Sequence, residues 1–547
     1  MAKKVFYDDD ARRRVLGGAE ALYNAVKVTM GPKGRNVVIA KSYGGPTVTH
    51  DGVTVAEGVE LANVDDETLG YSVGADLIKQ AATKMNKAAG DGTTTVTVLT
   101  YNILNEANRL IAAGHNPMEL KKGVEAAGAE VLSALSSLSE PVTGKKNRVA
   151  EVATISAGDS TIGELIAGVI DKVGREGVVT VEAGQGLEME SEVVEGFTFD
   201  RGYVSALMVT DTARQEAVYE KPAVVITDKK ISSVQEFLPM LEKLAQAGKK
   251  DVVLIADDVD GEALGILVLN KLKGVFNTVA VKAPSFGDRR KDVLEDIAAL
   301  TGATVVSEDR GMTFENVELD VVGSARKVIV AKDSTTIIEG AGVANSPKVV
   351  KARVDMIKAQ AEDATSEYEK ENYEKRVAAI EGKVAVIKVG GATETEIDEK
   401  KFRVDDAVAA TKAALEEGIV AGGGVTLVNL SDKLDATGSD SLAAGRSIVK
   451  NALLTPFRQL MLNAGLNADA LLAQVQAAKP GHGVNVNSPE KLVDLKAAGV
   501  VDPAAVTRQA VQNAVSIAAT AMTMGALVVD IPEEKPAAPD IGGMPGF

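Results

Sequence analysis

The sequence predicts a multidomain protein whose helix-rich ends enclose an α/β middle segment. A chain of 547 residues is too long for one ordinary hydrophobic core, and we expect about three domains. Apolar residues recur at helical spacing near both ends, whereas Val-rich runs alternate with amphipathic segments over 222–330. This pattern leaves two arrangements open: separate helical domains, or one helical domain formed by both ends with the middle inserted.

The N-terminal region is expected to be mostly helical. Apolar residues at helical spacing predict a helix over 11–30, which Gly31 and Pro32 end. The elements expected next are a hairpin over 36–42 and 47–50 with its turn at Gly44-Gly45-Pro46, a helix from about Thr94 to Gly114, and a helix ending near Ser139.

The middle segment is richer in short β-runs from about residue 175. The expected strands are Val178–Glu182, Glu190–Val194, Ala223–Thr227, Val252–Ala256 and Thr278–Lys282, with helices at 234–247 and 262–273. Over 222–330, strands that alternate with helices predict an α/β fold with parallel strands. Charged helices over 348–380, the strand Lys383–Val389 and Ala-rich helices from 404 to about 523 follow, and the tail 532–547 is expected to be disordered.

The composition limits the kinds of partner and metal. With 60 Lys and Arg against 77 Asp and Glu, the net charge of −17 argues against nucleic acid or an anionic membrane as the main partner. The chain has no Cys and three His far apart in sequence, so we expect any metal to be a hard ion on carboxylates. We find no apolar run long enough to cross a bilayer and no export signal, which favours the cytoplasm.

The run Gly90-Asp91-Gly92-Thr93-Thr94-Thr95 is the most specific motif. Its glycines let the backbone approach a ligand, and its threonines begin a helix whose N–H groups and dipole suit a phosphate. Asp91 adds a hard oxygen for Mg²⁺. A plain capped helix start is the alternative, but the combination favours ligand binding. Neither a Walker-type nor a Rossmann-type glycine motif occurs, so a P-loop NTPase and a Rossmann dehydrogenase are excluded.

Three further motifs are less specific when taken alone. Thr29–Asn36 is either a simple helix stop or a loop that presents backbone to a base and phosphates. Gly422-Gly423-Gly424 is either a flexible joint or a point of close approach to a ligand. Arg403-Val404-Asp405-Asp406 either places acids at a helix start or supplies an aspartate that positions water for attack on a terminal phosphate.

The two expected helices at 234–247 and 262–273 carry more apolar residues than one core-facing stripe needs, such as Met240 and Leu269. Core burial and an exposed binding patch both remain open for them.

In this order and spacing, the motifs resemble those of the group I chaperonins, the GroEL family, over essentially residues 5–530. The resemblance rests on Thr29–Asn36, Gly90–Thr95, Phe199-Asp200-Arg201-Gly202-Tyr203, Phe286-Gly287-Asp288-Arg289-Arg290, Arg403–Ala407 and Ala421-Gly422-Gly423-Gly424. It implies an equatorial domain over 1–140 and 418–547, an intermediate domain over 141–194 and 384–417, and an apical domain over 195–383. It therefore favours the arrangement in which both ends fold together.

The resemblance also implies roles for single residues. An ATP site would be lined by Thr29, Met30, Gly31, Pro32, Asp51, Asp91, Gly92, Thr93, Thr94, Thr95, Gly423, Asn485 and Asp502. Asp91 would hold Mg²⁺, K⁺ is a further candidate cation, and Asp406 would orient the attacking water with Asp51 as a second catalytic carboxylate. Non-native proteins and the co-chaperonin would bind a surface of Tyr203, Leu207, Met208, Leu238, Leu241, Leu264, Val268 and Leu269.

Members of the family build two stacked seven-membered rings, capped by a small GroES-like co-chaperonin, and use ATP hydrolysis to enclose non-native polypeptides for folding. Two departures stand out: His50 replaces a phosphate-facing Lys, and the stretch 52–90 is longer near Asn63–Asp66. The alternatives are a metabolic ATPase or kinase whose α/β insert binds a small molecule, and a non-catalytic scaffold, against which the intact Asp91 and Asp406 argue.

Overall fold

The computed structural model describes residues 3–40, 46–61, 67–142, 144–174, 177–184, 186–212, 214–364, 366–438 and 440–531. The chain divides into two compact units, one of Met1–Asp171, Val181–Met189 and Val389–Phe547, the other of Lys172–Thr180 and Glu190–Lys388. Gly44, Gly45, the insertion at Asn63–Asp66 and the tail 532–547 lie outside the described residues. The division into three domains stays a prediction.

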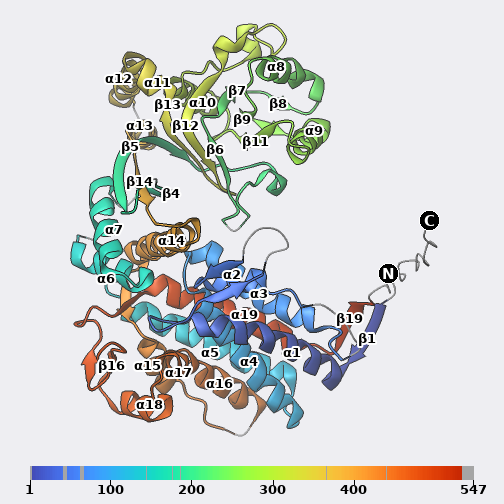
Figure 1. Cartoon of the computed structure of the whole chain (residues 1–547), viewed down its shortest axis with the longest axis vertical. Coiled ribbons are helices and arrows are strands. Elements are labelled where there is room, and N and C mark those ends of the chain that lie inside the picture. The colour runs from blue at the N-terminus through green and yellow to red at the C-terminus, as the bar shows by residue number, and fades with distance from the viewer. Residues whose placement is uncertain are drawn as a thin grey trace, which may run out of the picture. The chain divides into compact units, whose positions relative to one another are not determined.

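The first unit joins the two helix-rich ends of the chain. Strand β1 (Lys3–Tyr7) pairs antiparallel with β19 (Ala526–Asp530), so that Lys3 lies opposite Asp530 (Figure 1). One core cluster contains Leu22 and Leu99 from the N-terminal part and Ala514 from the C-terminal part, all buried. Of the two arrangements left open by the pattern, the structure has the one in which both ends fold together.

The helices of the first unit are α1 (Asp8–Val26), α2 (Gly52–Gly58), α3 (Tyr71–Ala89), α4 (Thr93–Ala112), α5 (Pro117–Leu138), α6 (Lys146–Ala157), α7 (Ser160–Val173), α14 (Glu394–Glu417), α15 (Val425–Lys433), α16 (Ser441–Ala452), α17 (Thr455–Asn463), α18 (Ala468–Ala477) and α19 (Ala504–Ala521). Its further strand pairs are β2 (Val37–Ile39) with β3 (Thr47–Thr49), β15 (Ile419–Ala421) with β18 (Val501–Pro503), and β16 (His482–Val484) with β17 (Leu492–Asp494).

Small residues let the helices of this unit pack closely. A Cβ added to Gly18 in α1 would lie 1.7 Å from the carbonyl oxygen of Tyr71, and one added to Gly74 in α3 would lie 1.8 Å from that of Val15. No side chain fits at either position, so the crossing of α1 and α3 requires glycine on both helices. This packing accounts for a core that contains few aromatic rings.

The second unit contains a mixed sheet. Its strand order is β11 (Asn277–Lys282), β9 (Asp251–Ala256), β7 (Ala223–Ile226), β12 (Gly323–Val330), β13 (Thr335–Gly340), β5 (Glu190–Phe199), β14 (Lys383–Val389) and β4 (Val178–Ala183), with β6 (Ala217–Glu220) also beside β12. The prediction of parallel strands over 222–330 is confirmed for β7, β9 and β11 and is wrong for β12, which pairs antiparallel with β7 and β13. Outside that stretch, β13 and β14 each pair antiparallel with β5. The physical reason is the connection: β12 and β13 are joined by a short turn, and a parallel pair needs a long crossover.

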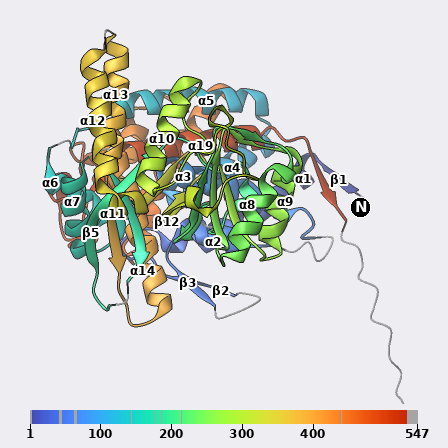
Figure 2. The same ribbon diagram turned by 90° about the horizontal axis from the view of Figure 1, so that it is seen from above.

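The other elements of this unit are α8 (Val234–Gln246), α9 (Gly261–Leu272), α10 (Asp288–Thr301), α11 (Ala341–Asn345), α12 (Pro347–Asp363), α13 (Glu367–Ile380), β8 (Lys230–Ile231) and β10 (Asp258–Val259). Helices α8 and α9 begin and end within a residue of the expected bounds. Figure 2 shows α12 and α13 running side by side, and the two helices cover the charged stretch 348–380 that was expected to be helical.

Candidate functional site

The turn before α4 places Asp91 at the head of that helix. Gly90 and Gly92 have φ of +65° and +80°, a left-handed conformation that favours glycine. The Oδ1 atom of Asp91 accepts the N–H of Gly92 at 2.5 Å, and its Oδ2 atom accepts the hydroxyl of Ser156 at 3.1 Å. Burial nevertheless raises the pKa of Asp91, because these hydrogen bonds only partly replace water.

The turn of Thr29 to Pro32 lies against the same helix head. Thr29 is buried, and its hydroxyl lies 3.1 Å from the hydroxyl of Thr94. The side chain of Asn463 in α17 donates to the carbonyl of Met30 at 2.9 Å and so holds the turn from the other side. Gly31, with φ of +81°, then redirects the chain into Pro32.

A second helix begins beside α4. Asp51 caps α2, because its Oδ1 accepts the N–H of Val53 at 3.2 Å and its Oδ2 accepts that of Thr54 at 2.9 Å. A Cβ on Gly52 would lie 2.4 Å from the hydroxyl oxygen of Thr94, so the first turns of α2 and α4 touch. The N-terminus of α4, whose N-cap residue Gly92 has no side chain to cap it, therefore lies beside the Asp51-capped start of α2. The first N–H groups and the positive dipole end of α4 form an arrangement that attracts phosphate.

Asp502 brings a further carboxyl to this region. It lies on β18 opposite Val420 of β15, and its Oδ1 lies 3.0 Å from the Cβ position of Gly422. Burial, and to a smaller extent the charge of Asp91, raises the pKa of Asp502 to about 7. The charge of Asp51 also raises the pKa of Asp91. Both carboxyls are therefore harder to ionise here than in water, mainly because they are buried.

The segments that carry Gly423 and Asn485 share a small hydrophobic core. Gly423 has φ of +62°, and the residues that flank the triple glycine, Ala421 and Val425, share a core cluster with Val484. Asn485 follows Val484 in the loop between β16 and β17, where its Oδ1 accepts the N–H of Asn487 at 3.0 Å. Its amide NH₂ group could donate to a ligand.

Helix α14, which carries Asp406, borders the site. A Cβ on Gly90 would lie 2.2 Å from the Cβ of Ala409, which follows the half-buried Asp406 by about one helical turn. The pKa of His50, which directly follows β3, is lowered mainly by burial. Two side chains of α14 also affect it: the charge of Glu399 raises the pKa, and that of Arg403 lowers it. Asp406 thus lies on the helix that approaches the Asp91 turn.

The carboxylate oxygens of this site fit one Mg²⁺ ion that is bound by protein and phosphate together. Among the described residues, no group of three or more His, Asp or Glu side chains is arranged to hold an ion by itself. Mg²⁺ usually binds one or two carboxylates and completes its octahedron with phosphate oxygens and water. Asp91 offers the carboxylate, and a cation beside it would favour the ionised form that burial, and to a smaller extent the neighbouring carboxylate, disfavours at Asp91 and Asp502.

Two side chains of this site were not predicted from the sequence. Ser156 lies near the end of α6 and Asn463 at the end of α17, far from the site motifs along the chain. No local pattern marks either residue, because each acts through a contact that only the tertiary fold creates.

The residues expected to form an apolar surface in the second unit divide into two groups. Leu207, Leu238 and Leu269 are 62%, 41% and 46% exposed, and Tyr203 and Leu264 are partly buried. Met208, Leu241 and Val268 are buried, and Met240, also considered for a patch, is fully buried. For Met208, Leu241 and Val268 the expectation of exposure is wrong, because they pack into the hydrophobic core of the second unit, and for Met240 the alternative of core burial is the one found. Leu272 and Val275, 70% and 51% exposed, extend the exposed set and were missed.

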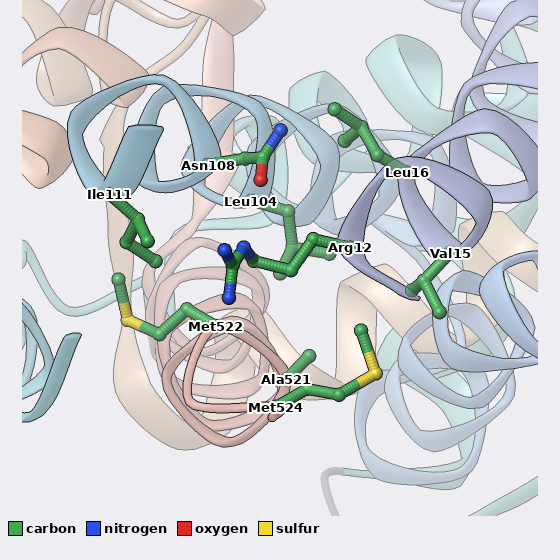
Figure 3. A pocket seen from close by; sticks show the side chains of 9 residues that line it. All are labelled: Arg12, Val15, Leu16, Leu104, Asn108, Ile111, Ala521, Met522 and Met524. Carbon is green, nitrogen blue, oxygen red and sulfur yellow. The ribbon is translucent and has the colours of Figure 1, made fainter. Parts of the chain in front are cut away.

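A small hollow of the first unit lies among α1, α4 and α19. Figure 3 shows its lining, in which Arg12 and Asn108 stand among apolar side chains that include Leu104, Ile111 and Met522. Its volume of about 20 Å³ holds roughly one water, so a nucleotide does not fit there.

Comparison with known families identifies the chain. A model of the TCP-1/cpn60 chaperonin family matches residues 22–532, which include every candidate site residue from Thr29 to Asp502. Together with the helical first unit and the mixed sheet of the second, this match confirms the expected fold class. It does not separate group I members from their TCP-1 relatives. No helix among the described residues has the length and apolar character that a bilayer crossing requires. The chain belongs to the TCP-1/cpn60 chaperonin family, whose members are nucleotide-dependent, ring-forming chaperones of protein folding.

Proposed function

We propose that this chain is a GroEL-like, group I chaperonin that hydrolyses Mg-ATP and captures non-native polypeptides on exposed leucines of its second unit. One observation carries the ATPase part of the proposal. The N-termini of α2 and α4 meet at the Asp91 turn, and α14 with Asp406 approaches that turn.

The triphosphate would bind where the two helices begin. Backbone N–H groups of Thr93, Thr94 and Thr95, at the positive end of α4, would bind its oxygens. The turn of Thr29, Met30, Gly31 and Pro32 would lie along the nucleotide, and Gly423, Asn485 and Asp502 would line the rest of the site. Asp91 would hold Mg²⁺, which neutralises phosphate charge as the terminal phosphoryl group is transferred.

Hydrolysis requires a water in line with the terminal phosphorus. Asp406 would accept a hydrogen bond from this water and take up its proton as the bond to the bridging oxygen of ADP breaks. Asp51 caps α2 in the same region and would help to orient the water. Because Asp406 belongs to another helix than the phosphate-binding residues, hydrolysis would depend on how closely α14 approaches.

Capture would use apolar burial, which does not depend on direction or sequence. Leu207, Leu238 and Leu269 expose apolar surface that a non-native chain could cover, with Tyr203 and Leu264 beside them. The same surface would bind a small GroES-like co-chaperonin. We also propose two stacked seven-membered rings, a cytoplasmic location and K⁺ as a possible second cation, all on the resemblance to group I members.

Asp91→Asn tests this proposal, with Asp171→Asn as its control. Asp171 is an exposed carboxylate of the same unit, 3.2 Å from Lys146. We expect the wild-type protein to hydrolyse ATP in the presence of Mg²⁺ and to refold a chemically denatured protein. Asp91→Asn should lose both activities, and Asp171→Asn should keep them. Absence of ATP hydrolysis in the wild type, or full activity of Asp91→Asn, would contradict the proposal.

A further inference from the structure

The last turn of α6 reaches the Asp91 carboxylate. Ser156 is the second-last residue of α6, and its hydroxyl donates to Oδ2 of Asp91 at 3.1 Å. The other oxygen, Oδ1, is engaged by the N–H of Gly92 at 2.5 Å. Two donors from two different elements thus fix the rotation of one carboxylate. Of these two, only Ser156 comes from outside the turn itself.

The same end of α6 is attached to α14. The Nη1 atom of Arg403 in α14 donates to the carbonyl of Ala157 at 3.4 Å, at the helix end where carbonyl groups lack intrahelical partners. Val152 of α6 shares a buried cluster with Ala410 and Ala414 of α14. Helices α6 and α14 therefore pack as a pair, and this pair carries both Ser156 and Asp406.

We propose that Ser156 is a positioning residue for the metal site: its hydroxyl holds the Asp91 carboxylate in the orientation that binds Mg²⁺ and ties that orientation to the α6–α14 pair. This inference rests on the proposed function. A hydrogen bond to a ligating carboxylate from outside the ligand set keeps one oxygen engaged and leaves the remaining lone pairs to the ion. Such outer contacts contribute about 10- to 100-fold to metal affinity or activity in other proteins.

The geometry also predicts a structural consequence in the nucleotide-free protein. Besides the apolar contact of Ala409 with Gly90, the Ser156 hydrogen bond joins the α6–α14 pair to the head of α4. Without this hydrogen bond, the last turn of α6 has one contact fewer with the head of α4. Its backbone hydrogen bonds should therefore open more often, which amide hydrogen exchange detects.

Ser156→Ala tests the inference, with Ser137→Ala as the matched control. The hydroxyl of Ser137 donates to the carbonyl of Ala134 in its own helix, at 2.7 Å. The first measurement is equilibrium binding of a fluorescent ATP analogue during a Mg²⁺ titration, which does not depend on hydrolysis. For Ser156→Ala we expect the Mg²⁺ concentration at half-maximal binding to rise about 10-fold or more. Ser137→Ala should match the wild type.

The second measurement is hydrogen exchange over 146–157 without nucleotide, where Ser156→Ala should exchange faster than the wild type. Ser156→Thr, which keeps a hydroxyl, should restore most of the Mg²⁺ response. A Ser156→Ala titration that overlays the wild-type curve, or a Ser156→Thr variant as impaired as Ser156→Ala, would overturn the inference while leaving the proposed function intact. If the wild type itself shows no Mg²⁺-dependent binding, both the inference and the proposed function are overturned.

Discussion

The head of α4 in the first unit and the outer side of α8 and α9 in the second unit are built on opposite principles. At the head of α4, glycines bring backbone and hydroxyl groups into direct contact, and buried carboxyls repel one another. On α8 and α9, Leu238 and Leu269 remain exposed although both helices pack on a large core.

This difference separates the two tasks of a chaperonin. A site for one defined ligand requires polar groups at set distances, and it tolerates almost no change in side-chain size. A surface for many non-native chains requires only accessible apolar area, and a flexible leucine supplies it without fixed geometry. The predictions below test each principle, beginning with the largest expected effect.

Leu238→Glu should abolish capture of an unfolded protein while ATP hydrolysis continues, because it places a charge on the exposed apolar surface and leaves the first unit unchanged. Light scattering of a denatured protein on dilution, with and without the variant, measures capture. The control is Glu242→Gln on the same helix. Retained capture by Leu238→Glu would show that this leucine is not part of the binding surface.

Leu241→Ala should destabilise the second unit by about 2–5 kcal/mol, because Leu241 is buried in its core. Leu238→Ala, on the same helix, should change stability by no more than about 0.5 kcal/mol. Urea unfolding followed by circular dichroism compares the two. Equal losses of unfolding free energy in the two variants would contradict the difference in burial between Leu241 and Leu238.

Asp502→Asn should stabilise the nucleotide-free protein most at about pH 8, and the effect should shrink as the pH falls and be small at about pH 4. The folded-state pKa of Asp502, about 7, lies above its ordinary value of 3.8, so the folded protein retains a proton that the unfolded chain releases. The stability contribution of Asp502 is therefore present at low pH and is lost as the pH rises from about 4 through about 7.

Melting temperatures of the wild type and Asp502→Asn across this range test the sign. A variant that is less stable than the wild type at the higher pH would show that the Asp502 carboxylate is not repelled by its surroundings.

His50→Gln should give the smallest of these effects, a change in how thermal stability depends on pH. Burial lowers the pKa of His50 in the folded protein, so its contribution to stability is present above the ordinary pKa of 6.5 and is lost as the pH falls below it. The variant should therefore lose less thermal stability than the wild type between about pH 7 and about pH 5. An identical or larger loss in the variant would contradict the lowered pKa of the partly buried His50.

Regular elements with strong local signals could be predicted from the sequence. The strand Lys383–Val389 has the expected bounds, and the threonines after Gly92 begin α4 as the motif indicates. Helix α3 was not predicted, because its buried face consists largely of small residues such as Gly74, Ala75 and Ala81, which give a weak apolar pattern. Strand β19 was not predicted because its partner β1 lies at the other end of the chain.

The motifs of the candidate site could be found from the sequence, but their mutual geometry could not. Residue types identify Asp91 and its threonines as a phosphate and metal motif. The contact of Gly52 with Thr94, the approach of Ala409 to Gly90 and the hydrogen bond of Ser156 to Asp91 arise only in the folded chain. The exposed leucines also required the structure, because the sequence pattern alone does not separate Leu238 from Leu241.

The central claim is that Asp406 on α14 acts on a terminal phosphate held at the head of α4, and Asp406→Ala tests it most directly. The matched control is Asp398→Ala, an exposed carboxylate on the same helix. ATP binding and single-turnover hydrolysis should be measured on the same preparations. We predict that Asp406→Ala binds ATP as tightly as Asp398→Ala does and hydrolyses it about 10²–10⁴-fold more slowly. Hydrolysis at the wild-type rate by Asp406→Ala would contradict the account.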